Sequence, residues 1–524
     1  MLVEIDRASN APLYMQIHQQ IREMILLGVL PTQTRLPPTR ELAKALDVNR
    51  TTVVNAYRRL WGEGLIEGRS GGGTIVAPYQ PGRPAIPEGH SLAWEKLYTD
   101  RLSAAKSGLS SERTPTDEED LVSFALGVAS GDVAARHGVQ AALAEPLLHE
   151  KGILERPAPQ GAPRLRKLIS EHLELDGIRA TPSQVLILSG VEQGVFVVAQ
   201  ALLERGDGVA VVSPTWPGAL RTLHTIGARV HAIPMDEEGI RLDVAEGILR
   251  HLHPKLLFVE PTFHNPTGRT MSLERRQGLL ELAYEHQVPI LELDARSFLR
   301  YEGRAIPSLK ALDRQNHVLY LSTFTEIVAG LRVAWLAAPQ RVAQQLMALK
   351  NSIESYTSGL GQSMVCTLFP WLDAHRDEIL DAFRARRDAM CEGLEEYCSS
   401  VARWTVPAGG LFVWGHLEGD LLAKPLLEDA LRAGVSYVPG PQFYAEGRGG
   451  KQNFRLNFTS ESEDRILQGL QRLGRILRTA EAAKKAARSP VRQEKSRVLL
   501  DRAPLPPEIR DPALAWETSR RINP

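Results

Sequence analysis

The 524-residue sequence predicts an α/β protein that consists of a small helical module followed by a large domain with a mostly parallel sheet. The chain is too long for one hydrophobic core, because single cores stop growing at about 250–300 residues. Residues 79–118 are rich in Pro, Ser, Gly and charge, which is typical of a linker. From Phe124 onward, short β-rich apolar runs alternate with helical stretches, as in sheets covered by helices on both faces. We therefore expect a module at residues 1–78, a linker at 79–118, a large domain at 119–478 and a disordered basic tail at 479–524.

The module contains a pattern of two helices joined by a tight turn. Residues 12–27 predict a first amphipathic helix that packs under this pair. Thr39 can cap the helix at residues 41–46, and residues 47–49 form the turn. The next helix, which begins near Arg50, has apolar positions at helical spacing, namely Val53, Val54, Tyr57, Leu60 and Trp61. Its other face carries Arg, Thr and Asn side chains, which can reach phosphates and base edges from a major groove.

A Gly-rich turn follows the second helix of the pair. Residues 65–67 and 74–76 predict two short strands around this turn, so that Arg69 lies exposed on a small wing. An amphipathic helix rich in Arg and Thr is, taken alone, more often a solvated surface. The order helix, turn, helix and wing favours DNA binding instead.

Residues 11–77 resemble the winged helix-turn-helix of GntR-type bacterial transcription regulators. This resemblance implies that double-stranded DNA is a partner of the module. It also implies that the DNA surface is formed by Arg35, Thr39, Arg40, Arg50, Thr51, Thr52, Asn55 and Tyr57, with Arg69 and Gly72 in the wing.

Composition excludes several other classes of protein. The 62 basic residues balance 62 acidic residues, so the chain is no general polyanion binder, and specific placement of charge must carry any DNA binding. Cys366, Cys391 and Cys398 lack metal or disulfide spacing, which predicts thiols in a reducing compartment and no metal site. Neither a signal pattern nor a run of about 18 apolar residues occurs, so we expect a cytoplasmic protein without a membrane segment.

The large domain predicts a site at the carboxyl ends of its strands, where ligands bind in open α/β sheets. The strands are expected at residues 185–188, 209–212, 230–233, 256–259, 288–293 and 318–321, with helices at 191–204, 217–226, 242–251 and 272–286.

The segments at these strand ends resemble the fold-type I aminotransferase domain. The resemblance rests on SGVEQG (189–194), HNPTG (264–268), ELDAR (292–296), STFTE (322–326) and NFRLNF (453–458), and it covers about residues 120–478. Together with the module it is similar to the MocR-type subgroup of GntR regulators. The subgroup implies pyridoxal phosphate as cofactor, an amino-acid-like effector and a head-to-tail homodimer.

The sequence lacks the residues that are central to this cofactor's chemistry. Pyridoxal phosphate needs a lysine amine for the aldimine and an acid at the pyridine nitrogen. The family's lysine is replaced by Glu326, and no lysine occurs between Lys310 and Lys350. Leu293 stands in place of the pyridine-binding acid and Ala295 in place of a tyrosine, while Asp294 should point away by strand alternation. We therefore assign no catalytic residue and expect no covalent cofactor. Three alternatives stay open: the cofactor binds non-covalently, another anionic or amino-acid ligand uses Arg332 and Arg455, or the domain serves only to dimerise.

Other parts of the pocket match the family. The resemblance assigns Asn265 to the ring hydroxyl, Trp216 to ring stacking, Arg455 to a substrate carboxylate, and a phosphate cup to Thr323, Thr325 and Arg332. Structural alternatives stay open. Asn265 can cap a turn, Trp216 can be part of the core, and Arg332 can form a buried ion pair with Glu326 or Asp294.

The sequence thus predicts a DNA-binding transcription regulator whose large domain dimerises and senses a small ligand without transaminase activity. Two alternatives remain at this point. One is an active pyridoxal-dependent aminotransferase, and the other is a ligand-independent repressor whose large domain is purely structural.

Overall fold

A computed structural model describes residues 3–7, 11–69, 73–78, 120–150, 155–324, 326–447 and 449–488. The chain divides into two compact units, within Met1–Leu97 and Tyr98–Pro524, and each is described by itself. The predicted linker, Gly72, Thr325 and the chain beyond residue 488 lie outside the described residues.

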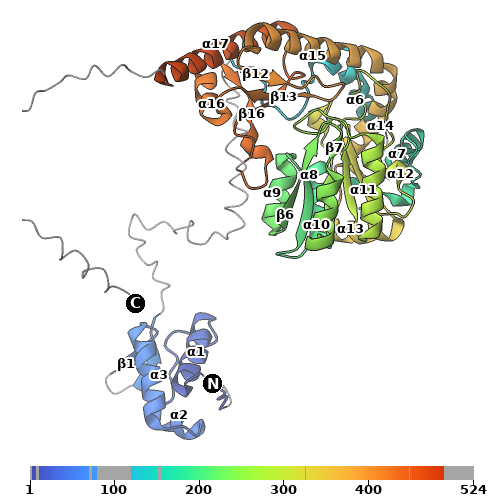
Figure 1. The fold of residues 1–524 in the computed structure, drawn as a ribbon. Helices are drawn as coiled ribbons and strands as arrows, with labels where there is room; N and C mark the ends of the chain where they lie inside the picture. Colours follow the sequence, from blue (N-terminus) through green and yellow to red (C-terminus); the bar gives the residue numbers. More distant parts are fainter. Residues whose placement is uncertain are drawn as a thin grey trace, which may run out of the picture. The chain divides into compact units, whose positions relative to one another are not determined.

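The N-terminal unit is a three-helix module with a wing (Figure 1). Helices α1 (Leu13–Leu26), α2 (Thr39–Ala45) and α3 (Arg50–Gly62) bury an apolar core that includes Ile17, Val53 and Leu60. The side chain of Asn49 caps α3, because its Oδ1 accepts a hydrogen bond from the Thr51 amide at 3.0 Å. Strands β1 (Ile66–Arg69) and β2 (Gly73–Val76) pair antiparallel and form the wing.

Two expected details of this unit are wrong. Thr39 is the first residue of α2, and the N-cap is Pro38, so the threonine side chain makes no cap. Trp61 is 65% exposed, because it lies at the last turn of α3 beyond the core formed with α1.

The large unit contains an eight-stranded sheet in the order β4-β11-β10-β9-β8-β5-β6-β7. Its central neighbours β10, β9, β8, β5 and β6 pair parallel, which confirms the predicted mostly parallel sheet. Strand β11 pairs antiparallel with both β10 and β4, and β7 pairs antiparallel with β6. The strands are β4 (Val185–Leu188), β5 (Gly208–Ser213), β6 (Arg229–Asp236), β7 (Gly239–Ile240), β8 (Leu256–Val259), β9 (Ile290–Asp294), β10 (Val318–Thr323) and β11 (Ala334–Ala337).

Helices cover both faces of this sheet. One apolar cluster joins alternate strand residues to α8 (Val191–Leu202), α9 (Pro217–Ile226) and α13 (Gln340–Ile353). The opposite face packs against α7 (Pro163–Leu175), α10 (Leu242–Leu252), α11 (Leu273–Glu285) and α14 (Gly359–Ala374). Because successive side chains of a strand point to opposite faces, one strand contributes to both faces: Leu293 of β9 belongs to the first cluster and Ile290 of β9 to the opposite face.

A second, four-stranded sheet has the order β12-β13-β16-β15, and long helices α15 and α17 lie side by side near it in Figure 1. Its strands are β12 (Ala402–Trp404), β13 (Phe412–Leu417), β16 (Asn453–Asn457) and β15 (Val438–Pro439). The remaining elements are α5 (Asp132–Arg136), α6 (Val139–His149), α12 (Leu309–Leu312), α15 (Arg376–Cys398), α16 (Ala423–Arg432), α17 (Glu463–Arg488), the paired strands β3 (Val122–Ser123) and β14 (Val435–Ser436), and the short 3-10 turns Pro182–Gln184, Ala329–Leu331 and Gly440–Phe443.

The predicted start of the tail at residue 479 is too early. Helix α17 continues to Arg488, because residues 480–487, AEAAKKAA, are strong helix formers. No helix within the described ranges is long and apolar enough to cross a membrane.

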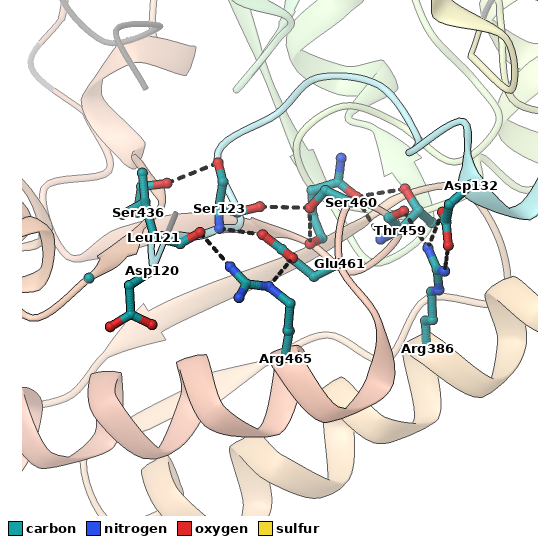
Figure 2. A network of polar contacts seen from close by, with 12 residues as sticks. Asp120, Leu121, Ser123, Asp132, Arg386, Ser436, Thr459, Ser460, Glu461 and Arg465 are labelled. Carbon is teal, nitrogen blue, oxygen red and sulfur yellow. Dashed lines mark hydrogen bonds and ion pairs between the residues drawn. The ribbon is translucent and has the colours of Figure 1, made fainter. Parts of the chain in front are cut away.

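Residues 120–132 join the large unit through a polar network beside α15 and α17 (Figure 2). Side chains that follow the second sheet bind backbone groups near the start of this stretch, and a side chain of α15 binds the Asp132 carboxylate at its end, so the stretch is fixed at both ends. The contacts are Arg465 to the Leu121 carbonyl (2.7 Å), the Ser123 amide to Glu461 (2.8 Å), Ser460 to the Ser123 carbonyl (2.7 Å) and Arg386 to Asp132 (2.5 Å).

Candidate functional site

The exposed face of α3 and the base of the wing form the candidate DNA surface. Arg35, Arg40 and Arg50 are exposed and have no carboxylate within 4 Å among the described residues, so their charges are available for phosphates. Arg35 also lies against the wing, since its Nε would be 3.2 Å from a Cβ placed on Gly73. Thr51 and Asn55 are exposed, and Thr39 and Thr52 are partly exposed.

Tyr57 is not part of this surface. Its side chain is 6% exposed, and its hydroxyl donates to the Pro37 carbonyl at 2.9 Å. Burial raises the pKa of this phenol far above its usual value. Tyr57 lies on the core face of α3, as its helical spacing from Val53 and Leu60 indicates, and it positions α3 against the segment before α2.

In the large unit, a buried ion triad lies where the sequence places the missing lysine. Glu326 accepts a hydrogen bond from Arg296 Nη2 at 3.3 Å, and Arg296 Nη1 donates to Glu260. The side chains are 9%, 5% and 1% exposed, respectively. The second oxygen of Glu326, Oε2, is buried and has no hydrogen-bond partner in the described part of the chain. One guanidinium therefore serves two buried carboxylates.

Burial shifts the pKa values of the two triad carboxylates and of the nearby His264. Burial raises the pKa of Glu260 to about 7, although the Arg296 charge and the Asn265 amide, 3.0 Å from Oε2, oppose the rise. Burial likewise raises the pKa of Glu326, against the opposing charge of Arg296. Burial and the nearby Arg296 lower the pKa of His264 to about 3, so this ring is neutral.

At the end of β9, Leu293 and Asp294 point to opposite faces of the sheet, as strand alternation predicts. Leu293 is buried in the apolar cluster that includes α8, α9 and α13, while the Asp294 carboxylate on the opposite face accepts the Tyr320 hydroxyl at 3.1 Å. Ala295 packs in the same cluster as Leu293 and does not project into the site. The side chain that reaches the site from this turn is Arg296, because the strand ends at Asp294 and the chain turns there.

Of the expected phosphate cup, the structure describes Thr323 and Arg332, and both side chains contact other groups of the chain. Thr323 donates its hydroxyl to the Val333 carbonyl at 2.8 Å. Arg332 has φ 36° at the end of a 3-10 turn, and its Nη2 lies 3.0 Å from Glu192 Oε2 in the first turn of α8. This pair is 63% and 44% exposed, so the alternative of a buried pair with Glu326 or Asp294 is wrong.

A separate cavity of about 290 Å³ remains beside the triad. Arg455, 5% exposed, stacks on Phe412 at 4.2 Å and donates from Nη1 to Asn265 Oδ1 at 3.2 Å. Asn265 thus binds the arginine, whereas the half-buried Trp216 lines the cavity. The other lining residues are Ala125, Leu126, Gly127, Pro217, Val438, Gln442 and Phe443.

The residues present do not fit pyridoxal phosphate. An acid replaces the amine, Leu293 offers no charge to a pyridinium, and the Glu192 carboxylate stands at the helix N-terminus that would otherwise attract a phosphate. The nearest lysines in sequence are engaged elsewhere. Lys310 donates to the Val318 carbonyl at 2.8 Å, and Lys350 lies 3.4 Å from Glu354.

Sequence reasoning missed Arg296, Glu260 and Glu192. A signal existed for the first two, because each follows the end of a parallel strand, and a lone arginine two residues after β9 requires a partner once buried. No cluster of three or more His, Cys, Asp or Glu side chains in the described ranges could hold a metal ion.

Comparisons with known proteins agree with this architecture. Residues 13–76 match the gntR family of bacterial regulatory proteins, and residues 119–473 match aminotransferase class I and II. The uncharacterized HTH-type transcriptional regulator YisV of Bacillus subtilis is 30% identical over 89% of this chain and 96% of its own length. The probable rhizopine catabolism regulatory protein MocR of Rhizobium meliloti is 29% identical over 69% of this chain and 72% of its own.

Solved structures show the same fold for the large unit. LysN, an α-aminoadipate aminotransferase from Thermus thermophilus complexed with a phosphopyridoxyl-leucine, superimposes with a TM-score of 0.68 at 30% identity. The match covers 75% of this chain and all of LysN. This chain therefore belongs to the aminotransferase class I and II family, whose members depend on pyridoxal phosphate, and it carries a GntR-type module. More narrowly, it has the MocR-type architecture and is a DNA-binding transcription regulator with an aminotransferase-like domain.

Proposed function

We propose that the large domain of this regulator performs no transamination, binds no pyridoxal phosphate, and serves as a dimerising sensor of a small carboxylate. The observation that carries the proposal is the buried triad of Glu260, Arg296 and Glu326. An aldimine needs an amine, and a carboxylate in its place can form none. Because Arg296 balances charge from within the chain, the interior of the site does not depend on a cofactor.

The class of ligand follows from the remaining cavity. Arg455 presents a planar guanidinium, which suits a carboxylate, between the apolar walls of Trp216 and Phe443. The volume of about 290 Å³ is at the lower end for ligand pockets, so the ligand is the size of a single amino acid. An amino-acid-like carboxylate meets both conditions.

The module reads DNA in the cytoplasm as part of a homodimer. Two helices α3 then reach two half-sites, and the large domains set their spacing. Arg35, Arg40, Arg50, Thr51, Thr52 and Asn55, with Arg69 on the wing, form the DNA-binding set in this proposal.

Pyridoxamine phosphate tests the loss of the cofactor. This compound carries its own amine and needs no lysine, so it separates loss of the covalent bond from loss of the whole site. Neither pyridoxal phosphate nor pyridoxamine phosphate is expected to raise the melting temperature of the full chain, whereas a true ligand raises it with concentration.

The results separate the three candidate functions. A saturable rise with pyridoxamine phosphate in the wild-type chain, or an adduct fixed by borohydride, would favour the aminotransferase. A panel of amino acids that leaves the melting temperature unchanged favours the purely structural domain.

A further inference from the structure

The candidate effector arginine holds the stretch of chain that leads toward the DNA-binding module. Arg455 Nη2 donates to the carbonyls of Ala125 and Leu126 at 2.7 and 3.2 Å. These two residues also line the cavity that Arg455 faces. The chain continues N-terminally from Asp120 through residues 79–119 to the module. One guanidinium thus contacts both the cavity and this connecting stretch.

The same stretch lies against the triad as well. The Ala129 amide donates to the Glu326 carbonyl at 3.0 Å, and Asn457 Nδ2 donates to the carbonyls of Leu126 and Val128 at 2.9 and 2.8 Å. Arg455 and Asn457 are both residues of β16, so one strand binds residues 125–128 from its side chains. Toward either end, Leu121 and Asp132 are fixed by the network of Figure 2.

From these contacts we infer that a carboxylate ligand acts by taking Arg455 away from Ala125 and Leu126. A bidentate carboxylate needs two parallel N–H groups, and the described contacts already commit Nη1 to Asn265 and Nη2 to the two carbonyls. A carboxylate adds a full opposite charge and a bidentate geometry that the two neutral carbonyls lack, so the carboxylate displaces the carbonyls. Among the described hydrogen bonds, residues 125–128 then keep those to Asn457, and this stretch shifts. The change passes along the chain toward the module.

This inference rests on the carboxylate cavity of the proposed function, but not on the loss of the cofactor. The two can therefore fail separately: binding of pyridoxamine phosphate would contradict the proposed function alone, whereas the variants below test Arg455 without any ligand.

Ligand-free variants of the full chain provide the test. Arg455→Gln removes the contacts to Ala125 and Leu126, and Arg455→Lys keeps the charge but reaches fewer acceptors. Arg275→Gln is the matched control, because Arg275 binds the Ile240 carbonyl and the Asp236 carboxylate and lines neither the cavity nor residues 122–130. Hydrogen exchange of the amides at residues 122–130 is measured together with the affinity for a duplex selected from random DNA by the wild-type chain.

Arg455→Gln is expected to speed exchange at residues 122–130 by about tenfold and to change the DNA dissociation constant by about fivefold or more. Arg455→Lys is expected to give an intermediate change, and Arg275→Gln none. Cooperative melting of each variant shows that it is folded. Wild-type exchange and wild-type DNA affinity in a folded Arg455→Gln or Arg455→Lys chain would overturn the inference.

L-leucine and its amide, L-leucinamide, add a direct measurement, since they share an apolar side chain and differ at the carboxyl group. Exchange at residues 122–130 that rises with leucine, but not with leucinamide, supports the inference. A rise with both compounds would overturn the role of the carboxylate.

Discussion

Replacing Arg296 by methionine removes the one cation of the triad while keeping an unbranched side chain. The arginine is 5% exposed and lies between Glu260 and Glu326, which are 1% and 9% exposed. Removing one partner of a buried ion pair costs about 3–5 kcal/mol, because the remaining charge stays desolvated. Here two carboxylates remain, so we expect the upper part of this range at pH 8.

The loss of stability caused by Arg296→Met should depend on pH. Without Arg296 the folded-state pKa values of Glu260 and Glu326 rise further above their unfolded values, so the variant takes up protons as the pH falls. Groups with raised folded pKa values contribute stability at low pH that is lost as the pH rises through the folded pKa. Uptake of one proton between pH 8 and pH 5.5 restores roughly 3 kcal/mol of the free energy of unfolding. The variant should therefore lose much less stability at pH 5.5 than at pH 8.

The assay is urea denaturation of the full chain at both pH values, followed by near-ultraviolet circular dichroism of the large domain. Arg300→Met is the matched control, since Arg300 is partly buried over Phe263 at 4.7 Å without a carboxylate within 4 Å among the described residues. Its loss should cost about 1 kcal/mol or less at either pH. A cost below about 1 kcal/mol for Arg296→Met at pH 8, or a cost equal at both pH values, would refute the assignment of a charged triad.

Three further outcomes are expected. The wild-type large domain should lose roughly 3 kcal/mol of stability between pH 4.5 and about 7 through Glu260, because its pKa rises from 4.5 to about 7 on folding; urea denaturation across this range measures the loss. Arg50→Ala should weaken DNA binding about tenfold or more, and it should reduce the slope of log affinity against log salt concentration by about one; binding curves at several salt concentrations measure both. Tyr57→Phe should cost the module about 1 kcal/mol through the lost bond to Pro37 while leaving DNA affinity unchanged, which a thermal melt and a gel shift would check.

Periodicity was sufficient to predict the central strands of the large sheet and the helices between them. Predicted runs such as 185–188 and 256–259 are buried strands, and a helix such as α9 begins and ends at the predicted residues 217 and 226. Strand alternation also placed Leu293 and Asp294 on opposite faces correctly. Such patterns depend on local spacing, which a single sequence displays directly.

The site could be predicted only in part, because its contacts join residues far apart in the chain. Arg296 meets Glu326 across 30 positions and Glu260 across 36, and neither partner is visible from spacing. The turn after β9 decides that Arg296 and not Ala295 enters the site, and the left-handed backbone of Arg332 sends its side chain to Glu192. Side-chain direction at such turns follows from backbone dihedrals that the sequence pattern does not specify.

Because Glu326 is paired with Arg296, restoring a lysine at position 326 alone does not restore the cofactor site of the family. Glu326→Lys alone would place an ammonium where Arg296 Nη2 now lies 3.3 Å from a carboxylate, and like charges at that distance oppose each other strongly in a buried site. Glu260 can balance only one of the two cations. Arg296 must therefore change together with Glu326, and Leu293 must become an acid to hold a pyridinium. The single change should destabilise the domain without creating a cofactor site, and only the combined changes make an amine compatible with this interior.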